Sequence, residues 1–227
     1  MKICVVVPTL NEESAIKKVI EEIPNPLTNR IVVVDGGSSD NTIPIAKNVK
    51  KEDCGIEVMM QEGKGKGMAF QTFLKKTNLD EFDAYAMLDG DCSYDPIELR
   101  ELVKPVLDCQ ADVVMGNRFA FDSKEGFKPT NYFGNKLLTF VANLLYRKNI
   151  KDLCTGYWVF SKEFLKRVEL KSKGFDLEAN LFAQAVKKKF RIKSMPIVYK
   201  QRIGCSKLKI RHAFTILHRL INERITN

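Results

Sequence analysis

KICVVVP, residues Lys2–Pro8, is an apolar run rich in valine. It is too short and too continuous for an amphipathic helix, so it predicts a strand that is buried on both faces. Runs of the same kind recur four times along the chain, at Arg30–Asp35, Ile56–Gln61, Ala84–Asp89 and Ala111–Asn117.

Stretches with helical periodicity separate these runs. They lie at Glu12–Ile23, Thr42–Lys51, Met68–Thr77 and Asp95–Leu107. In the last of them Asp95 is the expected N-cap and Pro96 the first helical residue. Strands that alternate with helices predict an α/β fold with a doubly wound, mostly parallel sheet.

The alternation lapses after Asn117. We expect a polar loop at Asp122–Thr130, and further elements follow it. The expected helices are Tyr132–Arg147, Lys162–Leu170, Leu177–Lys188 and Leu208–Ile225, and the expected strands are Thr155–Phe160 and Arg191–Tyr199. Because nothing reads as a linker, we expect one α/β domain over residues 1–206 and a basic amphipathic helix over residues 207–227.

Composition excludes several classes of protein. Hydrophobic residues make up 44% of the 227 residues and charged residues 29%, values ordinary for a soluble globular protein and unlike those of a disordered or fibrous one. The longest nearly unbroken apolar run, Leu137–Tyr146, falls well short of the roughly 20 residues that a membrane-spanning helix needs. The first residues lack the features of a signal peptide, so we expect a cytoplasmic protein.

The formal charge of +9 is unevenly distributed. Lys187–Asn227 contains twelve lysines or arginines and one acid, Glu223, whereas residues 1–186 contain 25 basic and 27 acidic side chains. The tail therefore carries +11 and the rest −2. Such a block suits phosphates, whether of nucleic acid, of an anionic membrane surface or of a phosphorylated substrate.

Acidic residues stand where predicted strands end. Asp89 and Asp91 lie two residues apart after the strand AYAML, and in open α/β sheets ligands bind beyond the carboxyl ends of the strands. Two such carboxylates suit Mg²⁺ or Mn²⁺ shared with a substrate diphosphate. Taken alone, an Asp-x-Asp pair more often marks a solvated turn.

Two glycine-containing segments also follow predicted strands. The turn Asp35–Asp40 offers a carboxylate to a base or ribose, and it equally suits a tight turn that caps the next helix. Gly63–Gly67 lacks the spacing of a phosphate-binding loop. It predicts a flexible basic loop able to lend its amides or Lys66 to an anion.

Taken together, these motifs resemble those of family 2 glycosyltransferases, and within that family the dolichyl-phosphate, or polyprenyl-phosphate, sugar synthases. The resemblance covers residues 2–208. Its motifs are P-x-L-N-E at residues 8–12, D-G-x-S-x-D-x-T at 35–42, G-K-G-x-A at 65–69, D-x-D at 89–91, G-x-R at 116–118 and D-x-x-T-G at 152–156. It implies a GT-A, Rossmann-like fold that binds a nucleotide-diphosphate sugar through a divalent metal, Mg²⁺ or Mn²⁺.

The resemblance also implies roles for individual residues. Asp35 would lie near the base, and Asp89 and Asp91 would bind the ribose or sugar and the metal. The nucleoside pocket would be lined by Pro8, Leu10, Asn11 and Glu12. The segment Arg202–Lys207 matches the R-x-x-x-S-K element used near the acceptor phosphate.

Two departures concern the donor. Ser93 stands where mannose-transferring members often have glutamine, and Asp35 is followed by Gly36 rather than by a second aspartate. They weaken a mannose assignment and leave UDP- and GDP-sugars both open.

The reaction that the resemblance implies is transfer of a hexose to a polyprenyl or dolichyl phosphate. That phosphate is already an anion, so it needs no general base, and we expect in-line attack with inversion. The metal on Asp91 would neutralise the leaving diphosphate, and Arg118, Arg202 and Lys207 would hold the acceptor phosphate. Glu178 is explained by its place at a helix start.

The tail has apolar residues at three- and four-residue steps among its cations, which indicates a basic amphipathic helix. By pattern alone it lies in a membrane interface or packs on the domain equally well. A lipid acceptor favours a peripheral position on the cytosolic face of a membrane, with a membrane-protein partner as a further expectation and no nucleic acid. The alternatives are a metal-dependent nucleotidyltransferase and, in another class, a nucleic-acid-binding protein that uses the basic tail.

Overall fold

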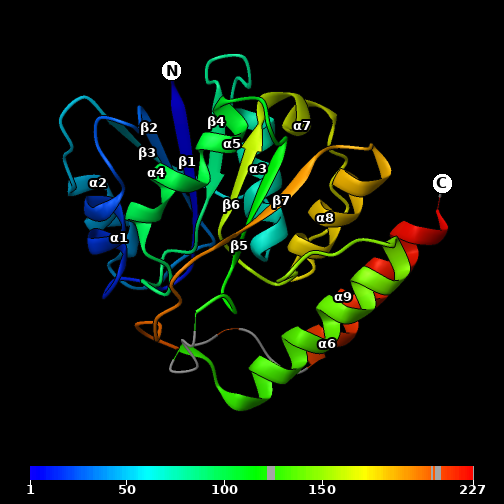
Figure 1. Cartoon of the computed structure of the whole chain (residues 1–227). Coiled ribbons are helices and arrows are strands. Elements are labelled where there is room, and N and C mark those ends of the chain that lie inside the picture. The colour runs from blue at the N-terminus through cyan, green and yellow to red at the C-terminus, as the bar shows by residue number, and fades with distance from the viewer. Residues whose placement is uncertain (122–125, 206, 208–210, 227) are drawn as a thin grey trace.

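The computed structural model describes the whole chain except residues 122–125, 206, 208–210 and 227. Its centre is a seven-stranded sheet in the order β3-β2-β1-β4-β6-β5-β7 (Figure 1). The strands are β1 (Ile3–Thr9), β2 (Arg30–Asp35), β3 (Gly55–Met60), β4 (Ala84–Met87), β5 (Val113–Asn117), β6 (Trp158–Ser161) and β7 (Ile192–Pro196).

Strand direction confirms a mostly parallel sheet. β1 pairs in parallel with β2 and β4, β2 with β3, and β5 with β7. Only β6 runs antiparallel among the described strands, between β4 and β5. The sheet is therefore mixed where the regular alternation of strand and helix lapses.

Helices cover both faces of the sheet. Alternate residues of β1 belong to the two cores, with Cys4 and Val6 in one and Val5 and Val7 in the other. The first core includes residues of α3 (Lys66–Lys76), α6 (Pro129–Tyr146), α7 (Lys162–Arg167), α8 (Leu177–Lys187) and α9 (Arg211–Ile225). The second includes residues of α1 (Ile16–Glu22), α2 (Thr42–Asn48), α4 (Leu99–Leu102) and α5 (Lys104–Leu107).

Two predicted elements need correction. The helix expected at Asp95–Leu107 is divided into the 3₁₀ turn η1 (Pro96–Glu98), α4 and α5. The break between α4 and α5 lies at Pro105, which has no N–H to donate to an earlier carbonyl. Asp95 does cap the first of these pieces and accepts a hydrogen bond from Ile97 N at 3.2 Å. The other correction concerns β3, which is partly exposed because it lies at the edge of the sheet.

The C-terminal helix α9 packs on the domain. Ile216 and Leu220 are buried in the core, and Tyr146 of α6 donates a hydrogen bond to Leu220 O at 2.8 Å. Glu223 is 1% exposed and accepts hydrogen bonds from Asn180 and Gln184 of α8. In the described part of the chain no helix is both long and apolar enough to cross a bilayer. Ser206 and the expected start of this helix at Leu208 lie outside the described residues.

Phe70 joins α3 to the sheet, since it is fully buried and its ring lies 5.8 Å from Phe73 and 5.6 Å from Phe160. We expect Phe70→Ala to lower the free energy of unfolding by about 3–5 kcal/mol, because it leaves a cavity in the core. Urea denaturation measures this. Phe133→Ala, at a side chain that is 72% exposed, is the matched control and should change stability by less than about 0.5 kcal/mol. Equal effects of the two changes would contradict the packing described.

Candidate active site

Three parallel strands bring their carboxyl ends to one edge of the sheet. Thr9 at the end of β1 lies opposite Asp35 at the end of β2, and Leu88 N, just after β4, donates to Val6 O at 3.2 Å. Asp89 and Asp91 follow at once. The predicted site residues at the three strand ends therefore lie at the same edge.

The loop after β1 and the turn after β2 are hydrogen-bonded to each other. Asn11 N donates to Ser38 Oγ at 2.8 Å, and Ser39 N donates back to Asn11 Oδ1 at 2.8 Å. Glu12 N donates to Thr42 Oγ1 at 2.8 Å. The two segments form one wall, along which Pro8 is half-buried and Leu10 and Asn11 are exposed.

Asp35 organises that wall from within. Its side chain is fully buried and accepts hydrogen bonds from Gly37 N and Ser38 N at 2.8 Å each, and from Ser38 Oγ at 2.5 Å. The turn Asp35–Asp40 is thus held together by its own first residue. Of the two interpretations that the sequence allowed, these hydrogen bonds correspond to the tight turn.

Lys66 lies between two carboxylates. Its ammonium is 2.6 Å from Asp89 Oδ1 and 2.7 Å from Glu178 Oε1, and its side chain is 12% exposed. Burial alone would lower the pKa of Lys66, but the two carboxylates outweigh burial and raise it, so the lysine stays charged. This cluster joins the start of α3, the end of β4 and the first turn of α8.

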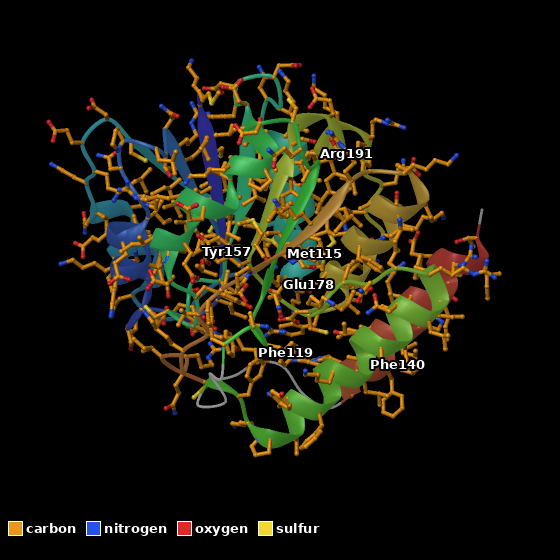
Figure 2. All side chains as sticks on the ribbon, viewed as in Figure 1. Met115, Phe119, Phe140, Tyr157, Glu178 and Arg191 are labelled. Carbon is orange, nitrogen blue, oxygen red and sulfur yellow. The ribbon has the colours of Figure 1, made fainter. Side chains whose placement is uncertain are left out.

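Glu178 is a site residue that the sequence explained too simply. The N-cap of α8 is Asp176, and the Glu178 side chain turns inward to Lys66 rather than serving the helix end alone. Figure 2 shows Glu178 in the interior below the sheet. Its local sequence is that of an ordinary helix start, so only the distance to Lys66, 112 residues away, reveals its role.

Two amides in the first turn of α3 are already hydrogen-bonded within the protein. Gly67 N donates to Gly174 O and Met68 N to Lys173 O, both at 3.1 Å. A Cβ at Gly65 would come within 2.6 Å of Lys173 O. The glycines therefore allow α3 to lie against the segment before α8, and Lys66 reaches the carboxylates of the site. Binding of an anion by this segment stays a prediction.

Asp91 is held from both sides. Ser93 donates to Asp91 Oδ1 through its N–H at 3.0 Å and its hydroxyl at 2.5 Å, while Asp91 Oδ2 lies 3.2 Å from Arg202 Nη1. Arg202 Nη2 also donates to Glu12 Oε1 at 2.9 Å, and Lys207 contacts the same oxygen. Burial raises the pKa of Glu12 even though Lys207 and Arg202 oppose it.

Arg202 is carried by a strap, the segment 197–204 after β7, which lies along residues 91–98. Lys200 N donates to Ser93 O and Ile203 N to Asp91 O, both at 2.9 Å. Val198 N donates to Glu98 Oε1 at 2.8 Å. These hydrogen bonds hold Arg202, a cation from the C-terminal part of the chain, beside Asp91 and Glu12.

Arg118 has a different environment from the other predicted phosphate ligands. It is 5% exposed and forms a bidentate ion pair with Asp152, with Nε at 2.6 Å and Nη2 at 2.8 Å from the carboxylate oxygens. Its guanidinium also lies 5.0 Å from the ring centre of Tyr199. Asp152 belongs to the D-x-x-T-G motif, and the structure identifies it as the partner of this arginine.

The charged side chains at this edge carry one more negative than positive charge, which favours binding of a cation. Four carboxylates (Glu12, Asp89, Asp91, Glu178) are paired with three cations (Lys66, Arg202, Lys207). A nucleoside diphosphate would add further negative charge. The described residues contain no cluster of three or more metal-ligating side chains. This donor set fits a divalent ion that one or two carboxylates share with substrate phosphates, the arrangement that Mg²⁺ favours, and does not fit an all-protein cage.

Comparison with known proteins identifies the family. The model of glycosyl transferase family 2 matches residues 4–169, and the chain belongs to that family. Among solved structures, glucosyl-3-phosphoglycerate synthase from Mycobacterium tuberculosis, in complex with Mn²⁺, uridine diphosphate and phosphoglyceric acid, superposes with a TM-score of 0.78. It is 20% identical, and the match covers 100% of this chain and 79% of that one. The predicted GT-A fold is confirmed.

Several of the curated relatives are archaeal glycosyltransferases. The low-salt glycan biosynthesis hexosyltransferase Agl6 of Haloferax volcanii is 33% identical over 90% of this chain, and glycosyltransferase AglJ of the same organism is 29% identical over 88%. This chain spans 49% of the length of the first and 63% of the second. The UDP-N-acetylglucosamine–dolichyl-phosphate N-acetylglucosaminyltransferase of Methanococcus voltae is 27% identical over 96% of this chain and 94% of its own length.

Gly156 lies against the carboxylate of Asp89. Its N–H donates to Tyr94 Oη at 2.6 Å, and a Cβ at this position would overlap the Asp89 carboxylate. We expect Gly156→Ala to displace Asp89 from Lys66 and to lower sugar-transfer activity at least about tenfold. Gly134→Ala is the control, because nothing lies within 4 Å of its Cβ. Steady-state kinetics on both variants tests this, and full activity of Gly156→Ala would show that the position of Asp89 is unimportant.

Glu98, which accepts a hydrogen bond from the strap, makes the stability of the protein depend on pH. Burial raises the pKa of Glu98 to about 6, and its Oε2 has no hydrogen-bond partner. Because the folded state binds this proton more tightly than the unfolded state, the ionised side chain costs stability above about pH 6 and costs none below the ordinary glutamate pKa.

We therefore expect Glu98→Gln to raise the free energy of unfolding by roughly 1 kcal/mol at pH 7.5, a value reduced for partial exposure of the side chain. The gain should shrink as pH falls through 6 and vanish near 4.5. Urea denaturation at several pH values measures it. Glu101→Gln, at an exposed glutamate, should have no such profile, and a gain at Glu98 that does not vary with pH would rule out the linkage.

Proposed function

We propose that this protein transfers a hexose from a nucleotide-diphosphate sugar, UDP- or GDP-linked, to a polyprenyl or dolichyl phosphate, with inversion at the anomeric carbon. The observation that carries the proposal is the contact of Arg202 with both Asp91 and Glu12. This contact brings Arg202, a cation suited to binding a phosphate, next to the carboxylates that follow β1 and β4. A donor diphosphate and an acceptor phosphate bound on the two sides of this contact would be neighbours.

On the donor side, the wall of Pro8, Leu10 and Asn11 with Glu12 would bind the nucleoside, and Asp35 would hold its shape near the base. Asp89, oriented by Lys66, would bind the ribose or the sugar. Asp91, with help from Asp89, would hold Mg²⁺ or Mn²⁺. When bound, the metal supplies positive charge to the diphosphate that leaves.

On the acceptor side, Arg202 and Lys207 are the cations that reach the site. An incoming phosphate offers them a further anionic partner besides Glu12 and Asp91, and the guanidinium suits bidentate contact. Because the acceptor phosphate is ionised near neutral pH, these residues need only position it and offset its charge. That Arg118 also contacts this phosphate stays a prediction, since Asp152 engages two of its nitrogens.

The relatives support a lipid phosphate as acceptor. The Methanococcus voltae relative is named for dolichyl phosphate, as are a dolichol-phosphate mannosyltransferase of Pyrococcus furiosus and a dolichyl-phosphate hexose transferase of Haloferax volcanii. We propose residues 1–206 as the catalytic unit, residues 207–227 as the helix that completes it, and a peripheral position on the cytosolic face of a membrane.

Asp91→Ala tests the reaction and its metal site together. We expect transfer of labelled sugar from UDP- or GDP-hexoses to polyprenyl phosphate, in the presence of Mg²⁺ or Mn²⁺, to fall by roughly 10³-fold, since transition-state charge loses its compensation. Asp108→Ala, at an exposed aspartate, should keep full activity. Circular dichroism should show both variants folded.

The position of the label decides between two enzyme classes. Sugar label in the lipid product supports glycosyl transfer, whereas nucleotide label in the product would indicate a nucleotidyltransferase. Near-normal activity of Asp91→Ala would remove the metal-site proposal.

A further inference from the structure

One side of α6 is apolar and exposed. Phe133, Leu137, Phe140 and Leu144 are 72%, 63%, 64% and 69% exposed, and their spacing of four, three and four residues sets them in a row along the helix. We call these four side chains the α6 stripe. Figure 2 shows Phe140 on α6, away from the sheet.

The fold does not account for the α6 stripe. The helix is anchored by its other side, where Leu138, Ala142 and Tyr146 are buried in the core. Full burial of one side chain the size of leucine or phenylalanine stabilises a folded protein by about 1.5–3 kcal/mol. The four side chains of the α6 stripe make no such contribution while they are exposed. A row of large apolar side chains on a protein surface marks an interaction site.

The charges around the α6 stripe indicate what covers it. Residues 127–151 contain five basic side chains and no acidic one, and the basic ones are Lys128, Lys136, Arg147, Lys148 and Lys151. Lys136, Arg147 and Lys148 are exposed. An apolar row whose charged neighbours within residues 127–151 are all cations matches the surface of an anionic bilayer, where acyl chains lie beneath phosphate headgroups.

The same charges disfavour a second copy of the chain. A symmetric contact through α6 brings identical surfaces together, so the cations of one copy would face those of the other with no acid of this segment between them. Like charges in such a contact are destabilising. A lipid surface has no such cost.

The α6 stripe is also continuous with the acceptor side of the site. Tyr132, in the first turn of α6, lies 5.2 Å from Phe119 between ring centres, and Phe119 lies 5.1 Å from Phe127. Phe127 in turn lies 4.6 Å from Tyr199, in the strap that carries Arg202. Aromatic contacts therefore lead from α6 to the residues proposed to hold a lipid phosphate, and Figure 2 shows Phe119 near the start of α6.

We propose that the α6 stripe inserts into the headgroup region of an anionic lipid bilayer and docks the protein there. The proposal deepens the proposed function and rests on it for the identity of the acceptor. It assigns docking to α6, whereas the lipid acceptor implied by the family resemblance favoured the C-terminal helix. In α9 the residues Ile216 and Leu220 are already used by the core, and Phe214 and Ile225, each 72% exposed, add to the apolar surface.

The test compares Phe140→Ser/Leu144→Ser with the matched control Met60→Ser/Ile97→Ser, which removes two exposed apolar side chains elsewhere, 51% and 56% exposed. We expect the wild type and the control to sediment with phosphatidylglycerol vesicles and to bind phosphatidylcholine vesicles much less. Binding of the α6 variant to phosphatidylglycerol should fall at least about tenfold. Urea denaturation should show all three proteins equally stable, since the altered side chains are exposed.

Three results would overturn the inference: unchanged vesicle binding by the α6 variant, equal loss in the control, or no binding by the wild type. A dimer seen by analytical ultracentrifugation and dissociated by Phe140→Ser/Leu144→Ser would also overturn it, by identifying a second copy as the occupant.

Transfer to two acceptors separates this inference from the proposed function. With a short, water-soluble prenyl phosphate and no vesicles, the wild type and the α6 variant should be equally active. With a long polyprenyl phosphate in phosphatidylglycerol vesicles, the α6 variant should lose about tenfold. Vesicle binding without transfer to either acceptor would refute the proposed function and leave docking intact, while transfer without vesicle binding would do the reverse.

Discussion

The ion pairs of Lys66 with Asp89 and Glu178 are the interaction on which the site depends. They join residues 66, 89 and 178, from the start of α3, the end of β4 and the first turn of α8. Lys66 and Glu178 are nearly buried, and buried charges are tolerated only when they are paired, so neither can lose its partner without a cost in stability. The geometry of Asp89 is therefore fixed by two helices and not only by its own strand.

The remaining charges divide the site into a rigid side and an exchangeable side. Asp35 and Asn11 hold the wall formed by the loop after β1 and the turn after β2 through hydrogen bonds to backbone amides. Arg202 in the strap and Lys207 after it, by contrast, pair with Asp91 and Glu12, and Asp91 is the carboxylate proposed to hold the metal. Cations that can exchange one anion for another are suited to guiding a phosphate acceptor toward a bound donor. The aromatic contacts of Phe127 and Tyr199 connect this exchangeable side to α6.

Residues close in sequence to a strand end were predictable, and those brought in from elsewhere were not. Asp89 and Asp91 follow an apolar strand, so their meeting with Asp35 follows from the geometry of parallel strands. Glu178 and Asp152 gave no such signal, because each is defined by a partner, Lys66 or Arg118, that lies 112 or 34 residues away in the chain. The partners of the Gly67 and Met68 amides could not be predicted for the same reason, since the carbonyls that accept from them belong to residues 174 and 173.

The sequence by itself determined the α/β alternation, the acidic strand ends and the family, because hydrophobic periodicity and short motifs are local properties of the chain. Only the tertiary structure decided which cation pairs with which carboxylate, and which of two amphipathic helices keeps an exposed apolar side. Periodicity shows that a helix has an apolar face but does not say whether the core covers it. In α9 the core buries Ile216 and Leu220, whereas in α6 it buries one side and leaves the four side chains of the α6 stripe exposed.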